Sequence, residues 1–201
     1  MGAELDCRMK KGSSYDNGKA LLENDAIFFS GHKGRVTVSF AASRDATVEG
    51  DWLCLQGYRF ELGAAIAPTW AEKIRNPKSV LQKLGVKPGV HVALVGELDE
   101  EFVAQLDRAG AEIDDRGPFD AIFVEAAEPR ALATLAEQKK KLKDNGALWL
   151  IRPKGKDTPV PESVSRAAGL AAGLVDVKVV AFSSTHSAEK YVVPLTARTR
   201  A

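Results

Sequence analysis

Residues 89–106, GVHVALVGELDEEFVAQL, read as a buried strand that passes through a short turn into a helix. The run HVALV is apolar throughout, which is typical of a strand covered on both faces of a sheet. Gly96 follows the strand. Asp99 and Glu100 come next, where carboxylates satisfy the free N–H groups of a helix start and oppose the positive end of its dipole. The stretch predicts a strand–turn–helix unit of an α/β protein, with the helix over 100–109.

Apolar strands and helices keep alternating downstream of this unit. The expected elements are a strand in AIFVEA, a helix over 129–143, a strand in ALWLIR, a helix over 161–172, and the strands LVDVKVVAF and KYVVPL. Strands separated by helical crossovers predict a parallel sheet. Only SSTHSAE separates the last two strands, so that pair should be antiparallel, because a parallel connection needs a dozen or more residues. AEIDD lies too close to the following strand to be its parallel neighbour, which predicts a reduced sheet.

The residues before this domain show a different pattern of apolar and polar side chains. Residues 1–18 are polar without periodicity, and we expect a flexible arm there. Residues 19–66 hold short apolar runs with a period of two, which predict a small antiparallel β domain with one buried and one wet face. Residues 67–87 predict two linking helices, the second capped by Asn76 and ended by Gly85.

Composition indicates an ordinary globular protein without a strong electrostatic field. The 201 residues are 45% hydrophobic and 27% charged, with 28 basic against 27 acidic side chains. Such a balance predicts no membrane partner and no strong nucleic-acid signal, and the lysines of EQKKKLKDNG suit the end of a helix. We find no secretion signal or membrane span, so the expected location is the cytoplasm. Cys7 and Cys54 lie far apart and predict reduced thiols.

Several segments resemble the class I S-adenosylmethionine-dependent methyltransferases. VKPGVHVALVG is similar to their first strand and its approach, GPFDAIFVEA to the strand after their phenylalanine–aspartate pair, and LKDNGALWLIRPKG to the strand after their glycine turn. The resemblance covers roughly the last 120 residues. It implies a reduced, Rossmann-like, methyltransferase-like α/β domain over 88–198, with a mostly parallel sheet and a terminal antiparallel hairpin.

The resemblance fails at the cofactor motif. The superfamily has an acid two residues before a glycine and further glycines at every second position, whereas Leu94, Gly96, Leu98 and Glu100 stand here. Leu98 and Glu100 would place side chains where glycines let a cofactor approach the backbone. A degenerate site of this kind predicts no bound cofactor.

Asp114 and Asp115 lie about 20 residues downstream, at the spacing of a ribose-binding acid. Because the glycines of the cofactor motif are missing, a solvated turn explains the two acids better. The chain also resembles a bacterial family defined only as a domain of unknown function with a methyltransferase-like core. The matching stretches are WAEKIRNPKSVLQKLGVKPG, ALWLIRPKG and GLVDVKVVAFSSTHSAEKYVV. That family often has an aromatic residue where His186 stands here. This resemblance implies an architecture and leaves the reaction open.

Polar residues follow the parallel strands at their carboxyl ends, where open α/β sheets bind ligands. An exposed polar rim is the competing interpretation. His32, His91 and His186 have no second ligand at metal spacing, and no residue has the pattern of a catalytic nucleophile, so we predict neither a metal nor catalytic residues. The candidate ligand cleft is formed by Gly96, Glu97, Glu125, Arg152, Lys154 and His186.

Three functional hypotheses follow. The first is a non-catalytic binding or assembly module with a degenerate methyltransferase-like fold. The second is an S-adenosylmethionine-dependent methyltransferase with an atypical cofactor loop. The third is a nucleic-acid or regulatory adaptor that uses the β domain as its contact surface. The partner stays unknown, and the sequence leaves a homo-oligomer open.

Overall fold

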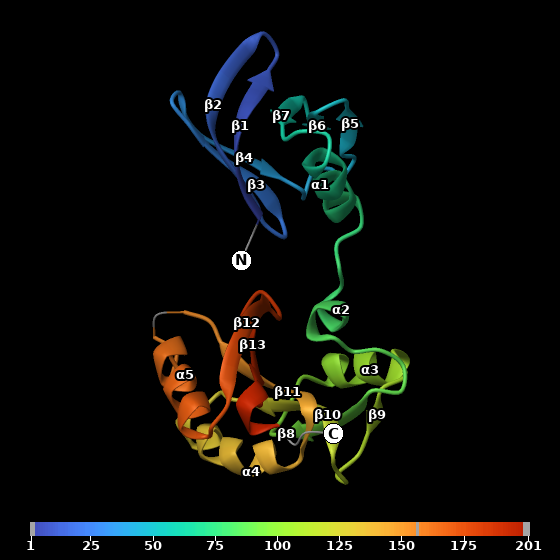
Figure 1. Ribbon diagram of the computed structural model, residues 1–201, viewed down its shortest axis with the longest axis vertical. Helices are drawn as coiled ribbons and strands as arrows, with labels where there is room; N and C mark the ends of the chain where they lie inside the picture. Colours follow the sequence, from blue (N-terminus) through green and yellow to red (C-terminus); the bar gives the residue numbers. More distant parts are fainter. Residues whose placement is uncertain (1–2, 156, 199–201) are drawn as a thin grey trace. The chain divides into compact units, whose positions relative to one another are not determined.

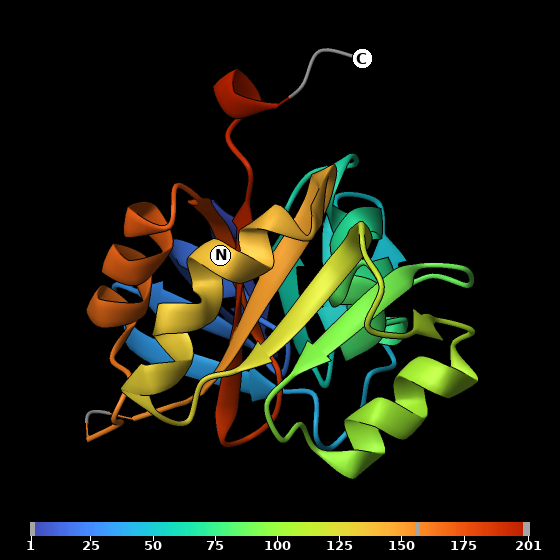
Figure 2. The same ribbon diagram turned by 90° about the horizontal axis from the view of Figure 1, so that it is seen from below.

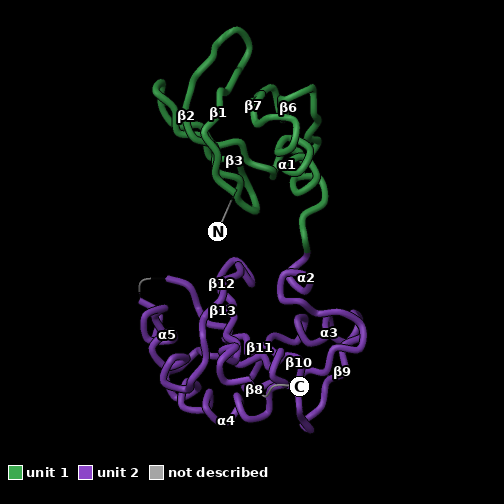
Figure 3. Tube along the Cα trace, in the orientation of Figure 1, with its two compact units in different colours: residues 1–78 green, residues 79–201 purple. Residues whose placement is uncertain are grey.

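The computed structural model describes residues 3–155 and 157–198. The chain divides into two compact units, Met1–Lys78 and Ser79–Ala201, drawn in different colours in Figure 3. Each unit has its own sheet and its own hydrophobic core, and the elements of both are labelled in Figure 1.

The first unit is a seven-stranded antiparallel sheet with one helix. The strands follow the order β4-β3-β2-β1-β7-β6-β5. Alternation places Phe29, Leu53 and Phe60 in the core, and helix α1 adds Trp70 and Ile74 to it. The elements are β1 (Ala3–Lys11), β2 (Ser14–Leu22), β3 (Ala26–Gly31), β4 (Gly34–Ser39), β5 (Thr47–Glu49), β6 (Trp52–Leu55), β7 (Tyr58–Glu61) and α1 (Ile66–Arg75).

The prediction of a flexible amino-terminal arm over residues 1–18 is wrong for its described part. Residues 3–11 form β1, which pairs with β2 along its whole length and with β7 on its other side. The sequence does alternate there, with Ala3, Leu5, Cys7 and Met9 toward the core and charged residues between them, but only Met9 is fully buried. Residues 1 and 2 lie outside the described residues. The β unit is also longer than the predicted 19–66, because α1 packs on its sheet.

The two short helices predicted between the domains are present, but they belong to different units. Helix α2 (Val80–Leu84) is capped by Ser79, which forms a capping box with Gln82. Asn76, the predicted cap, instead ends α1. Gly85 ends α2 in the left-handed conformation, as predicted.

The second unit is a six-stranded, mostly parallel sheet with the order β12-β13-β11-β10-β8-β9. Strands β9, β8, β10 and β11 are parallel, and β13 and β12 form the predicted antiparallel pair at one edge. The elements are β8 (His91–Val95), α3 (Glu100–Arg108), β9 (Glu112–Ile113), β10 (Phe119–Glu125), η1 (Pro129–Thr134), α4 (Leu135–Lys140), β11 (Leu142–Pro153), α5 (Glu162–Ala171), β12 (Val175–Ala181), β13 (His186–Val192) and η2 (Leu195–Ala197).

Helices cover both faces of this sheet. Helices α2 and α3 supply Leu84 and Phe102 to the core on one face, which includes Trp149 of β11. Helices α4 and α5 lie over the opposite face, whose core contains Leu135 and Tyr191 (Figure 2). None of the helices within the described residues has the length and apolar character needed to cross a membrane.

Two local predictions for this unit need correction. The helix predicted over 129–143 ends at Lys140, because Leu142 already pairs with Phe119 in the sheet. The AEIDD stretch forms the two-residue strand β9, which pairs with the start of β8, whereas β10 pairs with the other side of β8. Strand β9 and β10 are not neighbours, so their short connection does not conflict with a parallel sheet.

Asp16 holds the β3–β4 turn of the first unit together. Its carboxylate is buried and accepts hydrogen bonds from the backbone N–H groups of His32 (3.2 Å) and Lys33 (3.0 Å). A side chain on Gly31 would stand 2.1 Å from this carboxylate, so only glycine fits there. The turn depends on this one acid.

We expect Asp16→Ala to lower the free energy of unfolding of the first unit by roughly 1–3 kcal/mol, because two N–H groups lose their acceptor. Urea unfolding in a Trp149→Phe background reports on this unit, since the other two tryptophans both belong to it. The exposed Asp25→Ala is the matched control and should change little. Equal effects of the two substitutions would contradict this role of Asp16.

Candidate functional site

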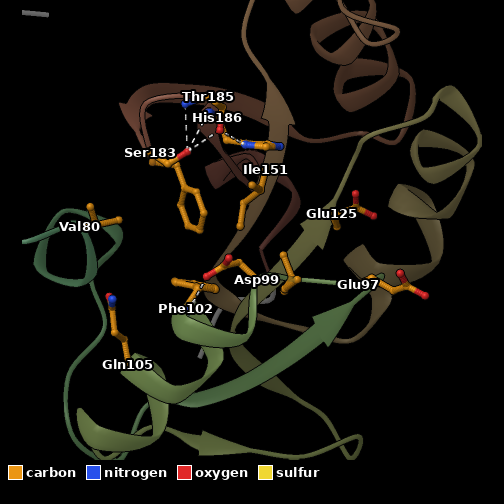
Figure 4. A pocket seen from close by; sticks show the side chains of 12 residues that line it. Val80, Glu97, Asp99, Phe102, Gln105, Glu125, Ile151, Ser183, Thr185 and His186 are labelled. Carbon is orange, nitrogen blue, oxygen red and sulfur yellow. Dashed lines mark hydrogen bonds between the residues drawn. The ribbon is translucent and has the colours of Figure 1, made fainter.

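A pocket of about 520 Å³ opens on the second unit at the carboxyl ends of the parallel strands. Figure 4 shows α3 on one side of it and the β12–β13 loop on the other. Its volume lies in the range of small-molecule sites. The lining residues are Val80, Glu97, Leu98, Asp99, Phe102, Gln105, Glu125, Ile151, Phe182, Ser183, Thr185 and His186.

The β8–α3 junction forms the floor of the pocket. Gly96 has φ of +89°, and a Cβ atom there would lie 2.9 Å from the Cβ of Glu125 on the neighbouring strand. Glycine is therefore required at this turn for both backbone and packing reasons. Asp99 then caps α3 by accepting the Phe102 N–H at 3.0 Å, which confirms that the helix caps itself with an acid.

The apolar wall of the pocket comes from aromatic and aliphatic side chains. The Phe102 ring makes edge contacts with Phe123 (5.1 Å between centroids) and Phe182 (4.8 Å), which fix its position. Leu98 is half-buried against the core beneath. Leu98 is part of the pocket lining, where its side chain was expected, whereas Glu100 is exposed and is not part of the lining, so the expectation is wrong for Glu100 alone.

The β12–β13 loop forms the opposite wall and is held by its own hydrogen bonds. The Ser183 hydroxyl accepts the backbone N–H of Thr185 (3.2 Å) and of His186 (3.0 Å). The Thr185 hydroxyl lies 2.9 Å from Nδ1 of His186, so Nε2 is the ring nitrogen without a protein partner among the described residues. Lys154 donates to the Ser183 carbonyl oxygen at 2.6 Å and supports the loop from outside.

The lining of the pocket carries carboxylates and no lysine or arginine. Glu97, Asp99 and Glu125 contribute carboxylates, and no lysine or arginine belongs to the lining. Together with the self-capped start of α3, this arrangement disfavours phosphate and other anions. It favours ligands that combine an apolar body with positive charge or hydroxyl donors.

The structure brings together part of the predicted cleft. Glu97, Glu125 and His186 line the pocket, and Gly96 packs against Glu125 at its floor. Lys154 stands just outside, where it holds the loop. Arg152 is absent from the lining.

Arg152 is a buried structural residue. Its guanidinium pairs with the buried carboxylate of Glu189 and lies 3.5 Å from the exposed Glu162. The other oxygen of Glu189 accepts the hydroxyl groups of Ser165 and Tyr191, each at 2.7 Å. Burial raises the pKa of the Tyr191 hydroxyl, and its bond to Glu189 raises it further. The side chains of successive strand residues point to opposite faces, so Arg152 turns away from the face of Ile151.

The cleft predicted from the sequence contained only three of the twelve lining residues, Glu97, Glu125 and His186. Phe102 and Gln105 lie three residues apart on α3, a spacing that places them on one helix face directly after the β8 turn. That signal was present in the sequence. Val80 and Phe182 carry no comparable signal, because only the folded sheet brings α2 and the β12–β13 loop to this edge.

His91 and Asp114 lie apart from the pocket. The His91 Nε2 atom is 2.8 Å from the Asp114 carboxylate, and Nδ1 is 3.1 Å from the Pro118 carbonyl oxygen. Asp114 also accepts the Arg116 N–H at 2.8 Å, so it is engaged as a turn residue. Neither residue lines the pocket, and a ribose-binding role for Asp114 has no support from this geometry.

The described residues contain no group of three or more His, Cys, Asp or Glu side chains arranged to hold a metal ion. Cys7 and Cys54 are free thiols, and burial raises the pKa of Cys7 to about 11. These are observations on the described residues of both units.

Comparison with known proteins gives partial structural matches only. The sequence matches no protein-family model and no curated protein. A SAM-dependent methyltransferase from Aquifex aeolicus gives a TM-score of 0.45 at 15% identity, over 61% of this chain and 93% of that chain. A methyltransferase from Pyrococcus furiosus gives a TM-score of 0.39 at 15% identity, over 56% of this chain and 78% of that chain. The O-methyltransferase NcsB1 from neocarzinostatin biosynthesis, in complex with S-adenosylmethionine, gives a TM-score of 0.42 at 12% identity. The match covers 52% of this chain and 49% of that chain, which is about half the length of NcsB1. These likenesses are loose, and we base the functional proposal on strand order and pocket.

Removing the Arg152 guanidinium should destabilise the second unit strongly. Arg152→Met leaves the Glu189 carboxylate buried without its cation, and we expect a loss of about 3–5 kcal/mol in the free energy of unfolding. Lys154→Met, two residues away and exposed, is the control and should cost much less. Chemical denaturation followed by circular dichroism measures both. Similar losses in the two variants would contradict the structural role of Arg152.

The His91–Asp114 pair should make stability depend on pH. Its hydrogen bond with Asp114 raises the pKa of His91, and bonds from Arg116 and His91 lower the pKa of Asp114. The pair is therefore fully stabilising below the ordinary histidine pKa of about 6.5 and is lost as pH rises through the raised value. At low pH, the stability that the pair contributes falls again, because Asp114 becomes protonated.

The difference in melting temperature between the wild type and Asp114→Asn measures this contribution. We expect the difference to be larger at pH 6 than at pH 8.5. A difference that stays constant across this range would show that ionised His91 does not stabilise the fold.

Proposed function

We propose that the second unit is a ligand-binding α/β domain and that its ligand is S-adenosylmethionine, with methyl transfer as the reaction. The observation that carries the proposal is the pocket of about 520 Å³ at the carboxyl ends of the parallel strands, with carboxylates and no cation in its lining. Ligands of open α/β sheets bind at this edge. A parallel sheet that ends in an antiparallel hairpin is also the arrangement expected of the methyltransferase superfamily.

The chemistry of the lining fits this ligand. S-adenosylmethionine supplies an electrophilic methyl group on a positively charged sulfur, together with an ammonium group, a carboxylate, ribose hydroxyls and a flat base. The lining offers no lysine or arginine to the carboxylate, so that group would have to face solvent. Glu97, Asp99 and Glu125 can accept hydrogen bonds from the ammonium and hydroxyl groups. Phe102 and Phe182 offer apolar surface for the base.

His186 is the residue available for proton transfer. In the tautomer in which Nδ1–H donates to the Thr185 hydroxyl, Nε2 is unprotonated and can take a proton from an acceptor molecule in the pocket. Bound S-adenosylmethionine would supply the methyl group, and Glu97, Glu125 and Phe102 are among the residues that would hold it. His186 would take the proton that the acceptor molecule gives up.

A binding role without catalysis is the second candidate. It is favoured by Leu98 and Glu100, which stand where the superfamily has glycines. The Leu98 side chain stands between the pocket and the backbone that follows β8. A ligand could therefore not contact that backbone as closely as it could if glycine stood there.

Isothermal titration calorimetry of the full chain with S-adenosylmethionine separates the two candidates. We expect saturable binding in the micromolar range, weakened about tenfold or more by Glu125→Gln, because a hydrogen bond to a charged group is lost. Glu128→Gln, three residues away and outside the lining, is the matched control and should bind like the wild type. No heat of binding at millimolar ligand would overturn the proposal in favour of the second candidate.

S-adenosylhomocysteine provides a further arm of the same experiment. It lacks the methyl group and the positive charge on sulfur, so an acidic pocket should bind it more weakly than S-adenosylmethionine. Equal affinities would show that the carboxylates do not face the sulfur.

A further inference from the structure

A row of side chains crosses the sheet of the second unit on the face of α2 and α3. Trp149 of β11 stands directly opposite Lys190 of β13, and Lys190 stands directly opposite Lys178 of β12. Both ammonium groups lie over the same indole, at 5.5 Å and 5.8 Å from its ring centroid. The row therefore places two positive charges side by side on one aromatic surface.

Two like charges directly opposite each other destabilise a pair of strands. The acids on these strands do not relieve the repulsion, because they lie on the other face. A register shift between Asp176 and Lys178 places Asp176 opposite Tyr191, and Glu189 precedes Lys190 directly in β13. On that other face, Asp176 pairs with Arg166 at 3.0 Å, and Glu189 pairs with Arg152. Among the described residues, neither Lys178 nor Lys190 has a carboxylate partner.

The two lysines differ in what else they contact. Lys178 donates to the backbone carbonyl of Lys83 at 2.8 Å, near the end of α2, where a cation complements the helix dipole. Lys190 has the indole ring as its contact. Burial lowers the pKa of Lys190, and the charge of Lys178 lowers it further. Lys178 thus has a structural role, whereas Lys190 adds an uncompensated charge.

Trp149 has an unpaired polar group of its own. Its side chain is fully buried, and its Nε1 atom has no hydrogen-bond acceptor among the described residues. A buried N–H group without an acceptor costs free energy, and most such groups in folded proteins are paired. The row therefore contains an unpaired N–H group as well as an uncompensated charge.

We propose that Lys178 and Lys190, above the Trp149 indole, form a binding site for a small oxyanion, a carboxylate or a phosphate group. An oxyanion between the two ammonium groups removes their repulsion and adds charge-assisted hydrogen bonds. The site shares no residue with the lining of the acidic pocket, and its ligand has the opposite charge. The inference is independent of the proposed methyltransferase function.

The Trp149 indole N–H is a local probe for this site. We expect titration of the full chain with inorganic phosphate, at constant ionic strength against chloride, to shift the Trp149 indole signal saturably in ¹H–¹⁵N spectra. Trp149→Phe identifies the signal among those of the three tryptophans. A second titration with succinate distinguishes a carboxylate ligand from a phosphate ligand, and saturation in either titration supports an oxyanion site.

Substitution of Lys190 tests the assignment. Lys190→Met should weaken anion binding about tenfold or more, whereas Lys190→Arg, which keeps the charge, should retain it. Lys190→Met should not lower the melting temperature, because it relieves the like-charge pair. The exposed Lys87→Met is the control and should bind like the wild type.

Two results would overturn the proposal. One is the absence of a saturable shift of the Trp149 signal with both anions. The other is equal anion affinity of Lys190→Met and the wild type, which would mean an adventitious ion only. The same spectra show whether each variant is folded.

Discussion

The turn between β8 and α3 is the constraint on which the site depends. Gly96 adopts a left-handed conformation beside Glu125, in a space that no side chain can share. This turn brings Asp99 to the start of α3, where it caps the helix and leaves Phe102 facing the neighbouring loop. The turn that ends the first parallel strand thus also places an acid and an aromatic ring on the wall of the pocket.

The sheet of the second unit separates two kinds of polar chemistry. On the α5 face, Arg152, Glu189, Ser165 and Tyr191 form a buried network whose members are paired with one another. On the α2 and α3 face, carboxylates line an open pocket and two lysines lie over Trp149 without an acid. Paired groups contribute to stability, whereas unpaired groups at an accessible surface are where ligands are recognised.

The sequence predicted the elements of the second unit well, because apolar strands, capped helices and a short final connection are local signals. The prediction of a flexible arm missed β1, although Ala3, Leu5, Cys7 and Met9 alternate there with charged residues as in a strand with one buried face. It assigned Arg152 to the ligand cleft because the residue follows a parallel strand, but which face a side chain occupies depends on strand register. Leu98 was expected to occupy the cleft, and it is part of the lining, but a pocket of about 520 Å³ stays open beside it.

We expect this pocket to accommodate an adenosyl ligand despite Leu98. A crystal structure of the full chain grown with S-adenosylmethionine tests it most directly. We expect the ligand between Phe102 and Phe182, with a hydroxyl or ammonium group within hydrogen-bond distance of Glu125. A structure in which Leu98 and Phe182 close the pocket and the ligand is absent from it would contradict the account.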